Sequence, residues 1–300
     1  MDLYFYLSIG LEFLLAMFVS GNNLSAAVGT LVGSKIISRA GGILIGAAGF
    51  SAGFLVQGRY MNSVALTLLP HSTYLVTILF LIVIVIFVVA QVLKSPLSLS
   101  MALVGTAVGI SLRIGSGINT GYLELLLGIW IVSPIAAIIL SYFGNLYLGR
   151  FQLNKTWNMA SALKVLLLLT SAFTAYTLGA NTIGLLGGFE GFTLASILSV
   201  LAGIAVGSTF LSAGVLKRVG EDMYSMRYFN ALVSLIVSSF MVEGATLFSF
   251  PLSNTQTLTS GVFGAGLSYK YKALFVRPFL VVVITWIVSP LIGMFLGFLA

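Results

Sequence analysis

Two kinds of polar interruption in apolar segments could bind an ion. In the first kind, Ser20-Gly21-Asn22-Asn23 interrupts the apolar run 4–32, and Gly179-Ala180-Asn181-Thr182 interrupts a later run. Glycine frees the backbone, and asparagine offers both a carbonyl oxygen and an amide donor. An unwound turn would expose carbonyl oxygens to a cation, and the start of the next half-helix would face an anion. Packing of small residues between helices is the alternative explanation.

The second kind of interruption places hydroxyl groups directly after a proline. Pro96-Leu97-Ser98 is followed by Ser100, and Pro251-Leu252-Ser253 is followed by Thr255. An apolar arm precedes each segment and a glycine-rich arm follows it, which predicts a helical hairpin with a polar tip. Hydroxyls and free N–H groups at the start of a half-helix form a neutral cradle for an oxyanion. Two ordinary spans joined by a Pro-Ser turn would give the same pattern.

Three charged side chains lie in or beside apolar segments, where charges are costly and usually functional. Lys94 precedes the first hairpin's proline and could offset the charge of an anion, or it could extend to a membrane interface. Glu12 and Glu243 could relay protons, and Glu243 could pair with Lys94, but either carboxylate could also lie near a wetted helix end. His71, the only histidine, is expected in a solvated loop.

The elements that must position these residues are membrane-spanning helices. Of the 300 residues, 59% are hydrophobic and 7% are charged, whereas soluble domains carry about 25% charged residues. Several apolar stretches reach the roughly 20 residues that span a bilayer as a helix. The sequence therefore predicts an all-α integral membrane protein of the plasma membrane. The net charge of +7 lies in short loops between apolar spans, so nucleic-acid binding is not expected.

Other function classes find little support in the sequence. It lacks cysteine, and it shows no catalytic or nucleotide-binding motif. We expect no enzyme, no metal site and no signal peptide. A channel and a structural membrane subunit remain alternatives to a transporter.

The chain repeats itself. Trp130-Ile131-Val132-Ser133-Pro134 recurs as Trp286-Ile287-Val288-Ser289-Pro290, and the two Pro-Leu-Ser segments and the two Asn-containing segments recur at nearly the same offset. This order predicts a first membrane repeat over residues 1–148, a cytoplasmic linker over 149–156 and a second repeat over 157–300. Many secondary transporters consist of two such repeats in inverted orientation, with the substrate between them.

The positions of the basic residues favour inversion. An inverted arrangement places most loop bases on one side, which the positive-inside rule identifies as the cytoplasm. The bases on that side are Lys35, Arg39, Arg150, Lys155, Lys217, Arg218, Arg227, Lys270 and Lys272. Arg59, Arg113 and Glu190 fall on the other side, and both termini are predicted to be external.

The four interruptions resemble the inorganic phosphate transporter (PiT) family of anion permeases. That family carries a Gly-Ala-Asn-Asp-Val-Ala-Asn motif in each half and a Pro-Val-Ser-Thr-Thr-His motif in each hairpin. The resemblance implies two inverted repeats of transmembrane helices, each with a broken helix and a helical hairpin. It implies ion-coupled transport of phosphate by alternating access, with no cofactor besides a coupling Na⁺ or H⁺. A homodimer in the lipid bilayer is plausible by analogy.

The resemblance also implies roles for residues at the motif positions. Ser98, Ser100, Ser253 and Thr255 would hold the anion. Lys94, which the resemblance does not supply, is a further anion-binding candidate because of its charge. Asn22 and Asn181 would line the ion or anion site.

The sequence departs from the family at the motif aspartates and histidines. Asn23 and Thr182 stand at the aspartate positions, and Met101 and Gln256 at the histidine positions. An amide or a hydroxyl binds a cation less well than a carboxylate does, so we expect weaker sodium binding than is usual in the family. Asn23, Thr182, Glu12 and Glu243 are the coupling-ion candidates. Sulfate is the alternative substrate, because it donates no proton and suits a site made of hydroxyl, amide and N–H donors.

Overall fold

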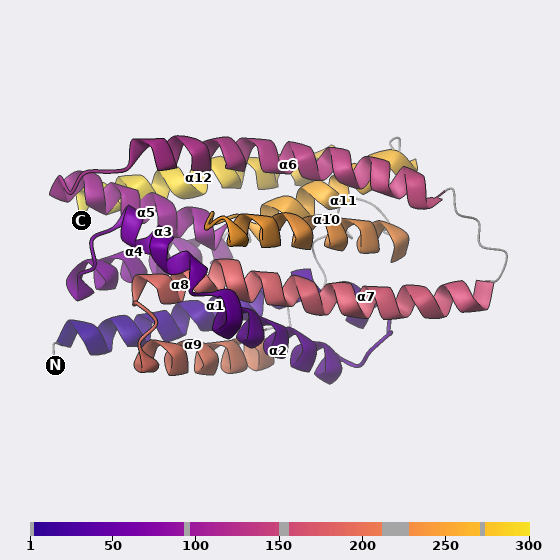
Figure 1. Cartoon of the computed structure of the whole chain (residues 1–300), viewed down its shortest axis with the longest axis horizontal. Helices are drawn as coiled ribbons and strands as arrows, with labels where there is room; N and C mark the ends of the chain where they lie inside the picture. The colour runs from indigo at the N-terminus through magenta and orange to yellow at the C-terminus, as the bar shows by residue number, and fades with distance from the viewer. Residues whose placement is uncertain (1–2, 93–96, 150–155, 212–227, 271–273) are drawn as a thin grey trace.

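The computed structural model describes residues 3–92, 97–149, 156–211, 228–270 and 274–300, and every regular element in these ranges is a helix (Figure 1). In chain order they are α1 (Leu3–Gly33), α2 (Arg39–Gln57), α3 (Tyr60–Leu68), α4 (Thr73–Val92), α5 (Leu99–Ile114), α6 (Thr120–Gly149), α7 (Thr156–Leu178), the π-helix η1 (Gly179–Ile183), α8 (Gly184–Phe189), α9 (Leu194–Val206), the π-helix η2 (Gly207–Leu211), α10 (Tyr228–Leu247), α11 (Asn254–Lys270) and α12 (Val276–Leu299).

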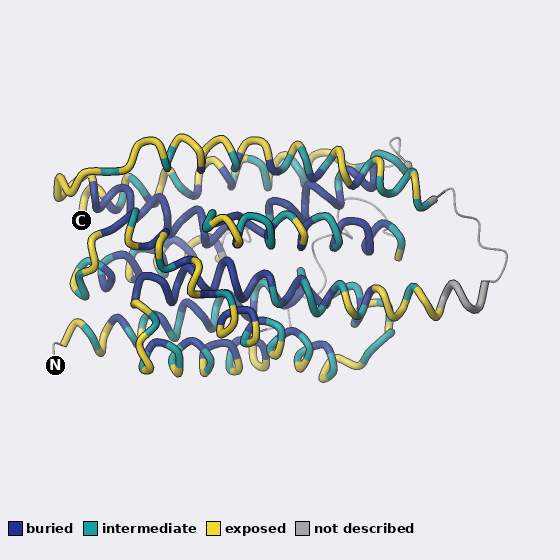
Figure 2. The backbone as a smooth tube through the Cα atoms, viewed as in Figure 1, coloured by how far each residue is buried: buried dark blue, intermediate teal, exposed yellow. Residues whose placement is uncertain are grey.

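Within the described ranges, eight helical segments are long and apolar enough to cross a membrane. Side chains on the outer faces of α6 and α12, such as Ile131 and Leu291, are apolar and exposed. The hairpin arm α5 is instead buried from Leu99 to Ser111, as the dark segments in Figure 2 show. An apolar exterior suits lipid as the surrounding solvent. The predicted all-α membrane fold is confirmed.

Several connections between helices fall at the two ends of the bundle. Both termini lie at one end, together with the α5–α6 and α8–α9 connections (Figure 1). The α1–α2 connection, the end of α6 and the start of α7 lie at the opposite end. The side of the membrane on which each end lies stays a prediction.

Packing partners exchange between the two halves of the chain. Helix α5 packs along α12, and its counterpart α11 packs along α6; likewise α1 packs along α9, and α7 packs along α2. Glycines permit the close approach of α2 to α7 and of η2 to α1. Gly53 of α2 lies on the backbone at Tyr176, and Gly207 of η2 lies on the backbone at Met17. The exchange supports a relation between the halves, and their inversion stays a prediction.

The interruption predicted at residues 20–23 is absent, because α1 is one continuous α-helix from Leu3 to Gly33. The Ser20 and Ser25 hydroxyls donate to the carbonyl oxygens of Met17 and Asn22 in the same helix, at 3.2 and 3.1 Å. A backbone surrounded by apolar groups keeps its own hydrogen bonds, even across glycine and asparagine. In the second half the predicted interruption is real but mild: it is the single π-helical turn η1, with helix on both sides.

Candidate functional site

Each predicted hairpin arm begins with a serine cap. Ser98 Oγ accepts a hydrogen bond from the Met101 N–H at 3.4 Å, and Ser253 Oγ accepts one from the Gln256 N–H at 3.3 Å. Both serines are buried. The first N–H groups of a helix have no partner within the helix, so the starts of α5 and α11 each direct free N–H groups toward the space before them. The α10–α11 turn lies well inside the bundle and not at one of its ends (Figure 1).

Asn181 holds the second hairpin tip. Its Nδ2 donates to Thr246 Oγ1 and to the Phe250 carbonyl oxygen, both at 2.9 Å, and its Oδ1 accepts from the Leu252 N–H at 3.0 Å. The side chain is fully buried. All three bonds end on α10 or on the turn that follows it, so one residue of the π-helix fixes the path of the hairpin tip.

The next residue reaches the other hairpin. The Ser100 hydroxyl on α5 donates to Thr182 Oγ1 at 3.3 Å, and both side chains are buried. Asn181 and Thr182 are adjacent on η1, so this turn lies between the starts of α5 and α11. The described residues of the two tips and of η1 carry no charged side chain. Hydroxyls, an amide and free N–H groups are donors suited to an oxyanion.

The remaining predicted anion ligands are less closely joined to this cluster. Thr255, the counterpart of Ser100, is half-buried on α11. Asn22 and Asn23 are half-buried on the continuous helix α1, which also approaches α10 and α11. Lys94 lies outside the described residues. The structure thus brings together Ser98, Ser100, Asn181, Thr182 and Ser253.

The two predicted membrane carboxylates each have one partner. The Ser196 hydroxyl on α9 donates to Glu12 Oε1 at 2.7 Å, and Gln57 Nε2 at the end of α2 donates to Glu243 Oε1 at 2.8 Å. The second oxygen of each carboxylate is buried and has no hydrogen-bond partner. Each carboxylate joins an element of the first half to one of the second, and among the described residues neither is hydrogen-bonded to a hairpin tip.

A third acid, Glu190, is buried just after α8 and interacts electrostatically with Glu12. Burial raises the pKa of the Glu190 carboxyl above its ordinary value of 4.5, and a hydrogen bond with Ser8 lowers it in part. A carboxyl whose pKa is raised by folding binds its proton more tightly in the folded state. Its contribution to stability is therefore greatest at acid pH and is lost as the pH rises from the ordinary pKa through the raised one.

We expect the Glu190→Gln variant to lose this pH dependence, because glutamine carries no charge to bury. The measurement is the Tm of the purified protein in detergent between pH 4 and pH 8, where about two pH units on either side of a pKa cover its titration. Glu124→Gln, at an exposed position on α6, is the matched control and should keep the decline of the wild type. A decline of unchanged steepness in Glu190→Gln would contradict the assignment.

Sequence reasoning missed three contributors to the site. Thr246 and Gln57 are partners of Asn181 and Glu243, and both stand in apolar helices where a lone polar residue was the only signal. Trp130 from the repeated Trp-Ile-Val-Ser-Pro segment also belongs here: its Nε1 donates to the Pro251 carbonyl oxygen, and its own carbonyl accepts from Gln256 Nε2, both at 2.8 Å. The repeat therefore anchors the second hairpin to α6.

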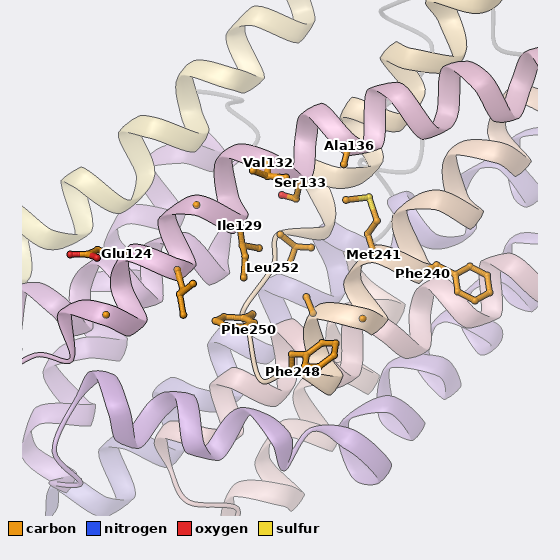
Figure 3. A pocket seen from close by; sticks show the side chains of 15 residues that line it. Glu124, Ile129, Val132, Ser133, Ala136, Phe240, Met241, Phe248, Phe250 and Leu252 are labelled. Atoms are coloured by element: carbon orange, nitrogen blue, oxygen red, sulfur yellow. The ribbon is translucent and has the colours of Figure 1, made fainter.

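An apolar cavity of about 700 Å³ opens beside this hairpin, between α6 and α10 (Figure 3). Phe250 and Leu252 of the hairpin tip line one side, and Ile129 and Val132 of α6 line another. Among the described residues that line it, Ser133 and Glu124 have the polar side chains. A lining of this kind does not suit an oxyanion, so the cavity is distinct from the cluster at η1.

Comparisons with known proteins agree with this geometry. Residues 154–297 match the sequence model of the phosphate transporter family. A Methanocaldococcus jannaschii protein named as a phosphate permease is 24% identical over 98% of this chain and 97% of its own length. A Bacillus subtilis protein named as a low-affinity inorganic phosphate transporter is 24% identical over 68% of this chain and 67% of its own length.

A solved structure has the same fold. The sodium-dependent phosphate transporter superposes with a TM-score of 0.83 at 16% identity, over 99% of this chain and 98% of that one. These matches confirm the resemblance predicted from the sequence: the chain is similar to the phosphate transporter family over its second half and to phosphate permeases over most of its length, and it has the fold of a sodium-dependent phosphate transporter.

Proposed function

We propose that this protein is a secondary transporter that moves inorganic phosphate across the plasma membrane by alternating access. The observation that carries the proposal is the meeting of both hairpin tips at one π-helical turn, through Asn181 and Thr182. Two helix starts that converge on a buried, uncharged cluster of donors suit a tetrahedral oxyanion. The exchange of packing partners between the halves supports an inverted pair that could rock about this point.

The proposal assigns the anion to Ser98, Ser100, Ser253 and Thr255, with Asn22 and Asn181 beside them. Transport is coupled to a cation gradient, with Asn23, Thr182, Glu12 and Glu243 as candidates for the coupling ion. One observation favours sulfate as the second candidate substrate: the described tip residues are hydroxyl, amide and N–H groups without a carboxylate. Protonated phosphate would gain from an acceptor there, whereas sulfate has no proton to donate.

Uptake into proteoliposomes tests the proposal. Labelled phosphate and labelled sulfate are supplied in separate experiments, with a sodium gradient, with a pH gradient and with neither. We expect phosphate to accumulate under a cation gradient and to exchange without one. If neither anion accumulates or exchanges, the transporter assignment fails; if only sulfate does, the substrate assignment fails.

Single hydroxyl deletions at the hairpin starts test the assigned site. We expect Ser100→Ala and Thr255→Ala each to weaken apparent phosphate affinity by about tenfold or more, because a hydrogen bond to a charged group contributes about 1.5–3 kcal/mol. The measurement is the concentration dependence of phosphate exchange. Ser63→Ala, on the exposed face of α3, is the matched control. Unchanged affinity in both hairpin variants would remove these residues from the site.

A further inference from the structure

One side-chain pair joins the two halves of the chain close to the hairpin-tip cluster. Gln57 Nε2 at the end of α2 donates to Glu243 Oε1 on α10 at 2.8 Å. The other oxygens of both side chains, Gln57 Oε1 and Glu243 Oε2, are buried and have no hydrogen-bond partner. Both of these atoms are acceptors as they stand, so neither can satisfy the other. A buried acceptor without a donor costs about 1–3 kcal/mol.

The pair lies about one helical turn from the residues that fix the second hairpin. Glu243 precedes Thr246 by three positions on α10, and residues at this spacing share a helix face. Thr246 in turn accepts a hydrogen bond from Asn181 on η1. At the α2 end of the pair, Gly58 follows Gln57 and packs against the backbone of Gly184. A Cβ added to Gly184 would lie 2.7 Å from the Gly58 Cα atom. A change in the hydrogen bonding of the pair would therefore alter the contacts that position the hairpin tip.

We propose that Gln57 and Glu243 form a proton-binding site, in which a proton on Glu243 Oε2 supplies the donor that both orphaned oxygens lack. A carboxylic acid and a primary amide are complementary: the amide donates N–H to the carbonyl oxygen of the acid, and the acid donates O–H to the amide oxygen. The first of these two bonds is already present at 2.8 Å. This inference rests on the proposed function and names the proton as its coupling ion.

A metal cation fits the pair less well than a proton does. Hard cations bind to several oxygen ligands at once, and the pair offers two orphaned oxygens, of which one is charged. In the part of the chain that the structure describes, no group of three or more His, Cys, Asp or Glu side chains could hold a metal ion. One added proton, in contrast, would satisfy both oxygens.

The titratable groups that interact with the pair are tyrosines and a carboxylate, which are neutral or negative and cannot offset the charge of Glu243. Tyr176 on α7 and Tyr60 on α3 interact with one another, and Tyr176 also interacts with Glu243. Glu124 on α6 lies across the apolar cavity that Gly244 lines. The described residues provide no base paired with Glu243, and the predicted partner Lys94 lies outside them. Arg59, two positions after Gln57, is exposed and forms no ion pair with Glu243 in the described part of the chain. We therefore assign neutralisation of this carboxylate to a proton.

Proton binding would alter the contact between the halves. With the proton bound, two hydrogen bonds join α2 to α10. Without it, a carboxylate oxygen and an amide oxygen are left without a donor, which weakens the contact between the helices. A ligand that binds one conformation better than the other shifts the equilibrium toward it. The pair would thus link proton occupancy to the position of α10 and of the hairpin tip that follows it.

Infrared difference spectroscopy on the purified full chain tests the site independently of transport. A pH jump should produce a carboxylic-acid carbonyl band that is absent in Glu243→Gln and shifted in Gln57→Leu, because the leucine removes the amide partner. Glu124→Gln is the matched control and should leave that band in place. If the Glu243→Gln and wild-type spectra are identical, or if the band is indifferent to Gln57→Leu, the proposed site is wrong.

A transport experiment tests the coupling. We expect a pH gradient to drive phosphate accumulation in the wild type and in Glu124→Gln, and the accumulation ratio to fall by about tenfold in Glu243→Gln, within the usual range of coupling between two sites. Phosphate exchange at equal pH should fall less than accumulation does. Accumulation that follows a sodium gradient alone would overturn the proton assignment. If the wild type neither accumulates nor exchanges phosphate, the proposed function fails, while the infrared bands still decide whether the proton site exists.

Discussion

Replacement of Asn181 by alanine is expected to release the second hairpin tip and abolish phosphate transport. Alanine removes the bonds to Thr246, Phe250 and Leu252, and it leaves the buried Leu252 N–H and the partly buried Phe250 carbonyl without these partners. Each orphaned group costs about 1–3 kcal/mol, a large share of the roughly 5–15 kcal/mol that stabilises a typical protein. We expect a lower Tm in detergent and a loss of phosphate exchange in proteoliposomes.

Two further variants separate the roles of the Asn181 amide. Asn181→Asp keeps an oxygen for the Leu252 N–H but loses both donors, so its Tm should fall between those of the wild type and Asn181→Ala. Thr246→Val should cost less, because it removes one of the three Asn181 bonds and leaves those to Phe250 and Leu252 in place. Asn22→Ala, at the matching position of the first half, is the control and should change the Tm little because Asn22 is half-buried on an intact helix. An Asn181→Ala protein as stable and active as the wild type would refute the clamp.

Much of the fold could be predicted because it follows from local pattern. Apolar stretches of bilayer length predict the spans, and a serine after Pro-Leu predicts the capped starts of α5 and α11. The shape of the two Asn-containing segments could not be predicted from glycine and asparagine alone. Both segments lie within the helix bundle, where the polar contacts are made by side chains and the backbone keeps its own helical hydrogen bonds. The sequence correctly indicates polar groups in both segments, but the predicted opening of the helix is larger than the single π-helical turn in the second half.

The contacts of the site depend on residues far apart in the chain. Asn181 was predicted to line the ion or anion site, and the structure shows its side chain bonded to a hairpin tip about 70 residues later. The amide forms its hydrogen bonds with the hairpin, and its role as an anion ligand stays a prediction. Gln57 was not predicted, because nothing near it in the sequence indicates that Glu243 lies beside it. Single-sequence patterns identify polar residues in apolar helices, but the pairing of those residues requires the fold.

Two glycine-to-alanine variants are expected to destabilise the folded bundle. A Cβ on Gly53 would overlap the Tyr176 carbonyl oxygen and lie 2.8 Å from the Ala180 nitrogen, and a Cβ on Gly207 would overlap the Met17 carbonyl oxygen. The obstructing atoms belong to the backbone, so no side-chain rotation relieves either overlap, and whole helices must separate. Overpacking costs about 1–3 kcal/mol even where side chains can move. We expect Gly53→Ala and Gly207→Ala to lower the yield of monodisperse protein and the Tm.

The control for both variants is Gly10→Ala, because an added Cβ at Gly10 has no atom within 4 Å. This change should leave the yield intact and raise the Tm slightly, since alanine favours a helix over glycine by about 1 kcal/mol. A normal Tm in Gly53→Ala would show that α2 and α7 do not approach as closely as described. Gly53 packs a helix of the first half on the second, and Gly207 packs an element of the second half on the first. A similar fall in Tm at both positions would therefore indicate that the two interfaces are equivalent, as two related halves require. A fall in Tm at one position alone would argue against that relation.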